Sequence, residues 1–240
     1  MELQERPKPV PAEGEYLIKV MANGICGSDV EGFLGKSGRR TPPMIMGHEF
    51  AGIIEEAPTG GAFKVGQNVT AFPKYYCGEC EICGQGLVNI CPGAPCLGVL
   101  DFDGTMTEYI TVKEKYLYPF SDAIDFTAAS MVEPLAVAVR GAENLPLNVM
   151  EKAENILVIG AGTIGLLLVQ ALRLRGYKGK ITVNDRAVFR LQKALEAGAD
   201  TIFIGDDFDH EVLEATDGRK FDASFECVGL AVKLEVTQTL

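Results

Sequence analysis

The sequence is short of features that would place it in a membrane or outside the cell. It contains no run of about eighteen apolar residues, the length that a membrane-spanning helix requires. Its first residues, Met-Glu-Leu-Gln-Glu-Arg-Pro, are polar, unlike a secretory signal. Positive charge is also scarce, because 22 Lys and Arg face 33 Asp and Glu, and a net charge of −11 would repel nucleic-acid phosphates. We therefore expect a cytoplasmic protein whose partners include neither nucleic acid nor a membrane.

Cysteine, by contrast, is concentrated in one stretch. Four of the 7 cysteines follow the pattern C-x2-C-x2-C-x7-C, formed by Cys77, Cys80, Cys83 and Cys91. Four thiolates at this spacing are typical of a structural zinc site, which is closed because four protein ligands leave no open position. The alternative is a disulfide-stapled loop, but nothing else marks a secreted protein. We predict that this lobe, residues 77–91, holds a zinc ion that maintains its shape and takes no part in chemistry.

A second group of possible metal ligands is spread along the chain. Cys26 lies in a polar turn, and His48, one of 2 histidines, is followed by Glu49. A thiol and an imidazole are two of the three protein ligands that an open, catalytic zinc site needs. The third could be Glu49 or Glu133, which interrupts an apolar helical run and would be costly to bury without a partner. Spacing alone leaves open whether these residues bind a metal or whether Cys26 is a packed thiol.

Hydrophobic periodicity divides the chain into two domains, which we place at residues 1–125 and 126–240. The first has short strands separated by turn signals, which predicts a small β-barrel. The second alternates strands and helices, which predicts a doubly wound parallel sheet and an α/β fold class. The expected strands are 15–21, 44–55, 65–72, 107–111 and 116–118, then 156–159, 181–184, 201–204 and 221–227, and the expected helices are 121–144, 165–175, 187–197 and 210–216.

A glycine-rich turn follows the first strand of the second domain. Residues 160–165 read Gly-Ala-Gly-Thr-Ile-Gly, and Asp185 ends the next strand. In this context G-x-G-x-x-G is a dinucleotide fingerprint, because glycines let the backbone approach a pyrophosphate and the helix start supplies N–H groups. The Asp185 carboxylate would bind ribose hydroxyls and repel a 2′-phosphate, which favours NAD over NADP, although Arg186 or Arg190 could attend a phosphate. The predicted cofactor-binding residues are Gly160, Gly162, Thr163, Ile164, Gly165, Asp185 and Arg190.

Several of these pieces occur together, and in the same order, in one enzyme family. They are GICGSD at 24–29, GHEFAG at 47–52, the four-cysteine lobe, VEPLAVA at 132–138 and GAGTIG at 160–165. With them the chain resembles the zinc-dependent medium-chain alcohol and polyol dehydrogenases. The EPL form, rather than a cysteine there, is most similar to the branch of sorbitol, galactitol-phosphate and threonine dehydrogenases. The resemblance implies a GroES-like β-barrel catalytic domain followed by a Rossmann domain.

The resemblance also implies roles for individual residues and a cofactor set. Cys26, His48 and Glu133 would bind a catalytic zinc, and Glu49 would be a neighbour that approaches the metal when water leaves. The four lobe cysteines would hold the structural zinc. The implied cofactors are therefore two Zn²⁺ per chain and NAD.

The implied reaction is hydride transfer between a secondary alcohol, such as a polyol or a sugar phosphate, and NAD. Zinc would stabilise the alkoxide. Ser28 would relay the proton, either to Glu31, where the family often has histidine, or directly to water. An L-threonine 3-dehydrogenase-like or sugar-acid dehydrogenase is the alternative of the same build. A non-catalytic, zinc-stabilised nucleotide-binding fragment is the alternative from another class.

The second domain has fewer strands than a full fold of its type. Four strands are expected in this sequence where such a sheet has six. We therefore expect a Rossmann domain truncated at the C-terminus, and a dimer or tetramer when the protein is full length. The substrate is not named by the sequence. The loop 32–40 carries Lys36, Arg39 and Arg40, which could meet a phosphate or a carboxylate, but a solvated basic loop is the plainer interpretation.

Overall fold

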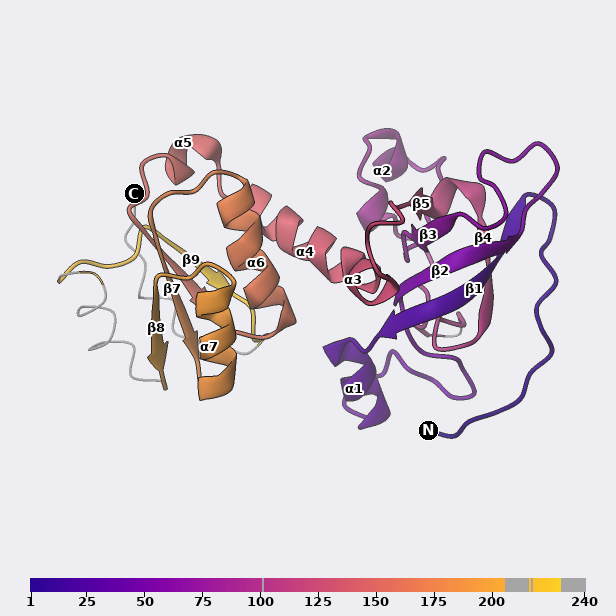
Figure 1. Cartoon of the computed structure of the whole chain (residues 1–240), viewed down its shortest axis with the longest axis horizontal. Helices are drawn as coiled ribbons and strands as arrows, with labels where there is room; N and C mark the ends of the chain where they lie inside the picture. Colours follow the sequence, from indigo (N-terminus) through magenta and orange to yellow (C-terminus); the bar gives the residue numbers. More distant parts are fainter. Residues whose placement is uncertain (101, 206–215, 217, 230–240) are drawn as a thin grey trace. The chain divides into compact units, whose positions relative to one another are not determined.

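Residue contacts divide the computed structural model into two units, Met1–Glu133 and Pro134–Leu240 (Figure 1). The structure describes residues 1–100, 102–205, 216 and 218–229. Each unit has a hydrophobic core of its own. Within the described ranges, no helix is both long enough and apolar enough to cross a bilayer. The domain boundary placed between residues 125 and 126 stays a prediction.

The first unit is built on an antiparallel sheet of five short strands. They are β1 (Glu15–Gly24), β2 (Glu49–Glu56), β3 (Asn68–Ala71), β4 (Tyr109–Lys113) and β5 (Leu117–Pro119). The sheet order is β4-β1-β2-β3-β5, so β1 pairs with both β2 and β4. Ile18 of β1 lies opposite Ile54 on one side and Ile110 on the other, and all three are buried. The pattern of short strands predicted for the first domain is confirmed.

Short helices connect these strands, and one of them was not predicted. The helices are α1 (Gly27–Phe33), α2 (Glu81–Gly84), η1 (Val88–Ile90), η2 (Glu114–Tyr116) and α3 (Phe126–Ser130). The expected polar turn at Cys26 is the N-terminus of α1. The Asp29 carboxylate accepts the backbone N–H of Cys26 at 3.2 Å, in a capping box that stabilises the first turn. This local cap forms a helix where glycines and polar residues had indicated a loop.

The strand expected over residues 44–55 begins later than predicted. In the structure β2 starts at Glu49, so His48 precedes the strand. Residues 45–47 instead bond through their backbone carbonyls to the N–H groups of residues 104–106, at 2.8–3.0 Å. The prediction was wrong at this end because a distant segment, rather than a neighbouring strand, satisfies the backbone there.

The second unit contains the predicted parallel sheet. Its strands are β6 (Asn155–Ile159), β7 (Lys180–Asp185), β8 (Thr201–Ile204) and β9 (Ala223–Glu226), in the order β8-β7-β6-β9. By position in the chain this is the order 3-2-1-4 of a doubly wound sheet. The helices are α4 (Val132–Glu143), α5 (Leu147–Met150), α6 (Thr163–Leu174) and α7 (Val188–Glu196). Figure 1 shows α6 and α7 side by side against this sheet.

Two helix predictions need a further statement. The helix expected over 121–144 is two helices, α3 and α4, and the Asp125 side chain caps α3 by accepting the N–H of Ala128 at 2.8 Å. The helix expected over 210–216 lies outside the described residues, apart from Thr216.

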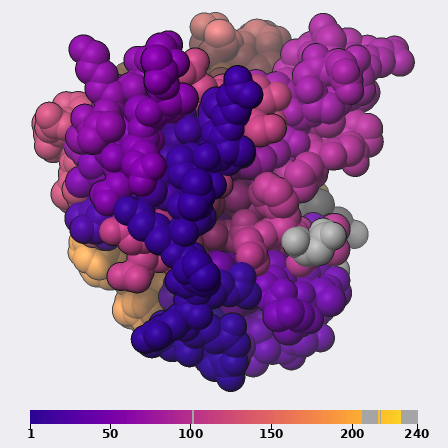
Figure 2. Space-filling model, turned by 90° about the vertical axis from the view of Figure 1, so that its right-hand side faces the viewer, coloured from indigo at the N-terminus to yellow at the C-terminus, as the bar shows by residue number. Residues whose placement is uncertain are grey.

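The N-terminal segment lies as an extended arm on the first unit. Figure 2 shows it in indigo, running across the surface of that unit. Arg6 pairs with Asp103 at 3.0 Å and Lys8 with Glu55 at 2.9 Å. The Lys8 ammonium also lies 4.3 Å from the centre of the Tyr109 ring. The arm is therefore attached by exposed charges rather than by a buried apolar face.

Candidate metal centres and nucleotide loop

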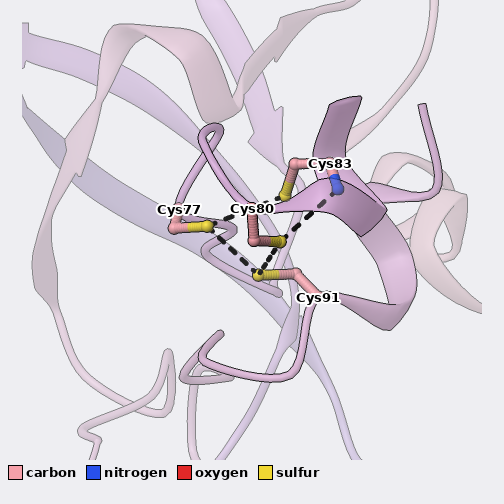
Figure 3. A group of neighbouring side chains, drawn as sticks. All are labelled: Cys77, Cys80, Cys83 and Cys91. Atoms are coloured by element: carbon pink, nitrogen blue, oxygen red, sulfur yellow. Dashed lines mark hydrogen bonds between the residues drawn. The ribbon is translucent and has the colours of Figure 1, made fainter. Parts of the chain in front are cut away.

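The four cysteines of the lobe turn their sulfur atoms toward one another (Figure 3). All four sulfurs lie within 4.8 Å of one another, and three of the separations are 3.7, 3.9 and 3.9 Å. A tetrahedral zinc with Zn–S bonds of about 2.3 Å needs sulfurs about 3.8 Å apart. A disulfide needs sulfurs about 2.05 Å apart, and all of these cysteines are free. The lobe thus has the geometry of a four-thiolate zinc site.

Little else in the lobe would hold its shape. Among residues 77–91 only Cys91 is buried. Backbone N–H groups of Glu79 and Cys80 hydrogen-bond to the Cys77 sulfur and lower the pKa of that thiol to about 6. A thiolate is the form that binds a metal, so this backbone favours coordination near neutral pH.

A second cluster in the first unit contains Cys26, His48 and Glu49. One ligand atom of each lies within 4.8 Å of the others. Cys26 caps α1, and the other two residues meet at the start of β2. The end of β1 brings them together, because Gly24 pairs with Glu49 two residues before Cys26. A Cβ on Gly24 would lie 2.3 Å from Glu49 Oε2, so a glycine is needed for the carboxylate to fit.

Glycines also hold the backbone that presents His48. Gly47 has a φ of +98°, which side chains rarely tolerate. A Cβ on Gly98 or Gly104 would come within 2.6 or 2.2 Å of the Gly47 carbonyl oxygen. Both glycines therefore let this backbone pack closely against the residue before His48.

The cluster is buried and has an unpaired nitrogen. Only 8% of His48 and 6% of Glu49 are exposed. Burial raises the pKa of Glu49 and of Cys26. His48 Nδ1 is buried without a hydrogen-bond partner among the described residues, and its nearest acid oxygen, on Asp29, is 3.9 Å away. A buried orphan nitrogen beside a thiol and a carboxylate fits a bound cation, and this sulfur, nitrogen and oxygen set suits zinc.

Glu133, the predicted third ligand, lies beside this cluster but is not one of its three members. It stands in the first turn of α4, and its pKa is raised by burial first and then by Glu49, while His48 lowers it. Glu133 is therefore an electrostatic neighbour of His48 and Glu49. The choice of Glu133 rather than Glu49 as ligand stays a prediction. Glu31, the predicted end of the proton relay, lies on α1 and is exposed.

Two further residues of this site, Asp29 and Arg40, were missed by the sequence reasoning as parts of the centre. Their side chains are 1% and 4% exposed. Arg40 Nη2 donates to Asp29 Oδ1 at 2.9 Å and to Ser28 Oγ at 3.0 Å. The expected solvated basic loop is thus corrected at Arg40, which is an internal residue, whereas Arg39 is exposed. The only signal in the sequence was an acid and a basic pair flanking the Cys26 turn.

The glycine-rich turn lies where β6 passes into α6. Gly160 has a φ of +99°, and a Cβ on Gly165 would lie 1.9 Å from the Gly160 carbonyl oxygen. Both positions therefore require glycine. Gly162 caps α6, whose first residues are Thr163 and Ile164 and whose first N–H groups have no acceptor within the helix. The turn can thus present backbone donors to an anion.

Asp185 stands at the end of β7 and faces this turn. Its Oδ2 accepts the N–H of Ala161 and its Oδ1 that of Ala187, both at 2.8 Å. Arg190 Nη1 lies 3.9 Å from Asp185 Oδ2 and its side chain is 51% exposed. The carboxylate is therefore fixed beside the glycine turn, and the arginine is its partner.

Two family models match the chain over most of its length. The alcohol dehydrogenase GroES-like domain matches residues 12–122, and the zinc-binding dehydrogenase model matches residues 163–239.

Three named relatives have similar sequences. Sorbitol dehydrogenase of Bacillus subtilis is 33% identical over 98% of this chain and 67% of its own length. D-arabitol-phosphate dehydrogenase of Enterococcus avium is 33% identical over 92% of this chain and 63% of its own length. L-threonine 3-dehydrogenase of Pyrococcus horikoshii is 33% identical over 98% of this chain and 67% of its own length. The chain thus spans about two thirds of the length of these relatives.

Solved structures are similar to the same extent. A zinc-binding dehydrogenase of Sinorhizobium meliloti, bound to NADP, has a TM-score of 0.83 and 31% identity over 93% of this chain and 65% of that chain. An alcohol dehydrogenase of Escherichia coli, complexed with NADH, has a TM-score of 0.81 and 33% identity over 95% of this chain and 66% of that chain. The predicted combination of a GroES-like domain with a Rossmann-type sheet is confirmed.

Proposed function

Because the chain belongs to the zinc-dependent medium-chain alcohol dehydrogenase family, we propose that it carries out hydride transfer between a secondary alcohol and NAD. The observation that carries this proposal is the buried cluster of Cys26, His48 and Glu49, with ligand atoms within 4.8 Å of one another. A family member without chemistry would have no need to bury an acid, a thiol and an unpaired imidazole nitrogen together.

Cys26 and His48 would hold a catalytic zinc, with Glu133 or Glu49 as the third ligand. When bound, this ion would polarise the alcohol oxygen and stabilise the alkoxide. Glu49 lies in the cluster and Glu133 beside it, so one acid can bind while the other approaches as water leaves. Ser28, between Cys26 and Asp29, would hold the proton of the alcohol.

The lobe cysteines would hold a second, structural zinc. Their sulfur separations match a tetrahedral thiolate site, as described above. Two zinc ions per chain therefore form part of the proposal. The lobe ion has no open position and would take no part in the reaction.

The second unit would bind the nicotinamide dinucleotide at the glycine turn. Asp185 would accept hydrogen bonds from the ribose hydroxyls, and its negative charge disfavours a 2′-phosphate. Arg190 is paired with this carboxylate, which weakens its availability to a phosphate. We therefore propose NAD rather than NADP, although the titles of similar structures name both NADP and NADH.

The proposed substrate is a polyol or a sugar phosphate, and the relatives named sorbitol and D-arabitol-phosphate dehydrogenase support it. An L-threonine 3-dehydrogenase-like activity is the second candidate, supported by a relative of that name. We further propose a homo-oligomer, dimer or tetramer, in the cytoplasm.

The test is to incubate the full-length gene product with polyols, sugar phosphates and L-threonine and follow NADH and NADPH formation. We expect a polyol or sugar phosphate to reduce NAD faster than threonine does, and two zinc ions per chain. Cys26→Ala should retain one zinc and lose turnover. One zinc in the parent chain and no alcohol-dependent NAD reduction would instead identify a non-catalytic nucleotide-binding protein.

A further inference from the structure

Arg40 is buried at a point where it contacts two groups of the candidate catalytic centre at once. Its Nη2 donates to Ser28 Oγ at 3.0 Å, and its Nη2 and Nε donate to Asp29 Oδ1 at 2.9 and 3.3 Å. A guanidinium has donors in a fixed planar fork, so these contacts set the angle between the hydroxyl and the carboxylate.

The two groups that Arg40 holds each touch a proposed zinc ligand. Asp29 Oδ2 accepts the backbone N–H of Cys26 at 3.2 Å and lies 3.9 Å from His48 Nδ1. Ser28 hydrogen-bonds to the Cys26 sulfur, which lowers the pKa of that thiol against the larger, opposite effect of burial. One cation therefore lies behind both sides of the metal centre.

The chain is shaped to let Arg40 reach this position. A Cβ on Gly32, in α1, would lie 2.1 Å from Cγ and 2.8 Å from Cβ of Arg40. The stem of the arginine therefore crosses α1 where the helix has no side chain. Next to it, the Arg39 carbonyl accepts the N–H of Leu100 at 2.7 Å, which anchors the backbone that carries the arginine.

We propose that Arg40 is the positioning residue of the zinc centre, holding the Ser28 hydroxyl toward Cys26 and the Asp29 carboxylate toward His48. It does not touch substrate or metal, and it acts through Ser28 and Asp29. It is also withdrawn from binding a substrate phosphate, because its donors are engaged and its side chain is 4% exposed. The kinetic part of this inference depends on the proposed dehydrogenase function, but the metal-binding part does not.

The first measurement is zinc release to a competing chelator, with the two sites counted separately. We compare Arg40→Lys with the exposed neighbour Arg39→Lys, and Gly32→Ala with Gly38→Ala, where a Cβ has open space. Arg40→Lys keeps the charge but not the fork, and Gly32→Ala displaces the arginine without altering it. Alanine also favours a helix, so loss of zinc in Gly32→Ala would not reflect a weaker α1.

We expect Arg40→Lys and Gly32→Ala to release one of two zinc ions at a chelator concentration about tenfold lower than the parent, since partners of metal ligands are worth about 10–100-fold in affinity. The four-cysteine ion and both control variants should match the parent. Release identical to the parent in both test variants would overturn the Arg40 proposal alone. A parent chain that holds one zinc would overturn the proposed catalytic centre and, with it, this inference.

The second measurement separates positioning from packing. In the full-length enzyme, Arg40→Lys should lower kcat about tenfold, leave KM for NAD unchanged, and add less than about twofold when Ser28→Ala is already present, because both changes act on one hydroxyl. Full additivity of the two substitutions would show that Arg40 does not act through Ser28.

Discussion

Glu114 joins three segments of the first unit through one carboxylate. Its Oε2 accepts the Tyr16 hydroxyl at 2.5 Å and the Ala62 N–H at 2.8 Å. These bonds, from the hydroxyl first and the backbone second, lower the pKa of Glu114. The charged form is therefore favoured by the folded state more than by the unfolded chain.

We expect Glu114→Gln to destabilise the protein above the carboxyl's unfolded pKa, about 4.3, and to have no effect at lower pH. A lowered folded pKa gives stability that is present above the unfolded pKa and lost as pH falls through the folded value. The measurement is urea unfolding of parent and variant between about pH 3 and pH 7, with the exposed Glu108→Gln as control. A parent–variant difference that persists at the acid end would contradict the argument.

At this scale, spacing was informative for ligands and silent about the groups behind them. The four lobe cysteines lie within a few positions of one another, so the sequence alone predicted that their sulfurs would meet. Cys26 and His48 were brought into question by residue type, and the structure places them together. Asp29 and Arg40 could not be predicted as a buried pair, because their contact depends on how the loop after α1 returns across Gly32.

Among the elements, the lobe depends most on a ligand. Its residues are largely exposed, so apolar burial contributes little and the proposed zinc would supply most of the stability. We expect Cys80→Ser to lose one zinc per chain and to raise amide hydrogen exchange across residues 77–91. Strands β1 and β2, whose core is elsewhere, should stay protected.

The control for this prediction is Cys96→Ser, which removes a thiol outside the four-sulfur group. It should retain both zinc ions and leave the lobe protected. If Cys80→Ser also retains two zinc ions, the four sulfurs do not share a metal and the lobe must be held in another way.

Element types were predictable where the apolar pattern was strong. The β6, β7 and β8 strands follow runs of buried residues that the sequence displays directly. Element ends were not, because they are set by contacts distant in sequence or by caps. The Asp29 cap begins α1 within an apparent loop, and the backbone of residues 104–106 delays β2 until Glu49.

For the whole molecule, the change from alternating short strands to a strand–helix pattern predicted two architectures, and the structure has two separate cores. Ile54 belongs to one and Leu172 to the other, and both are 0% exposed. Two cores without shared residues permit each unit to open independently. How strongly the units are coupled does not follow from a hydrophobic pattern, because that pattern reports burial within an element and not contacts between domains.

The independence of the cores leads to a prediction for the intact chain. Leu172→Ala and Ile54→Ala should each cost about 2–5 kcal/mol of local stability, because each leaves a cavity in a closely packed core. Native-state hydrogen exchange should show lost protection in β6 and β7 for Leu172→Ala and in β1 and β2 for Ile54→Ala, each without effect on the other unit. Leu174→Ala, on the same helix as Leu172 but 83% exposed, is the matched control and should change neither. Equal loss of protection in both units from either core variant would mean that the two cores unfold as a single cooperative body.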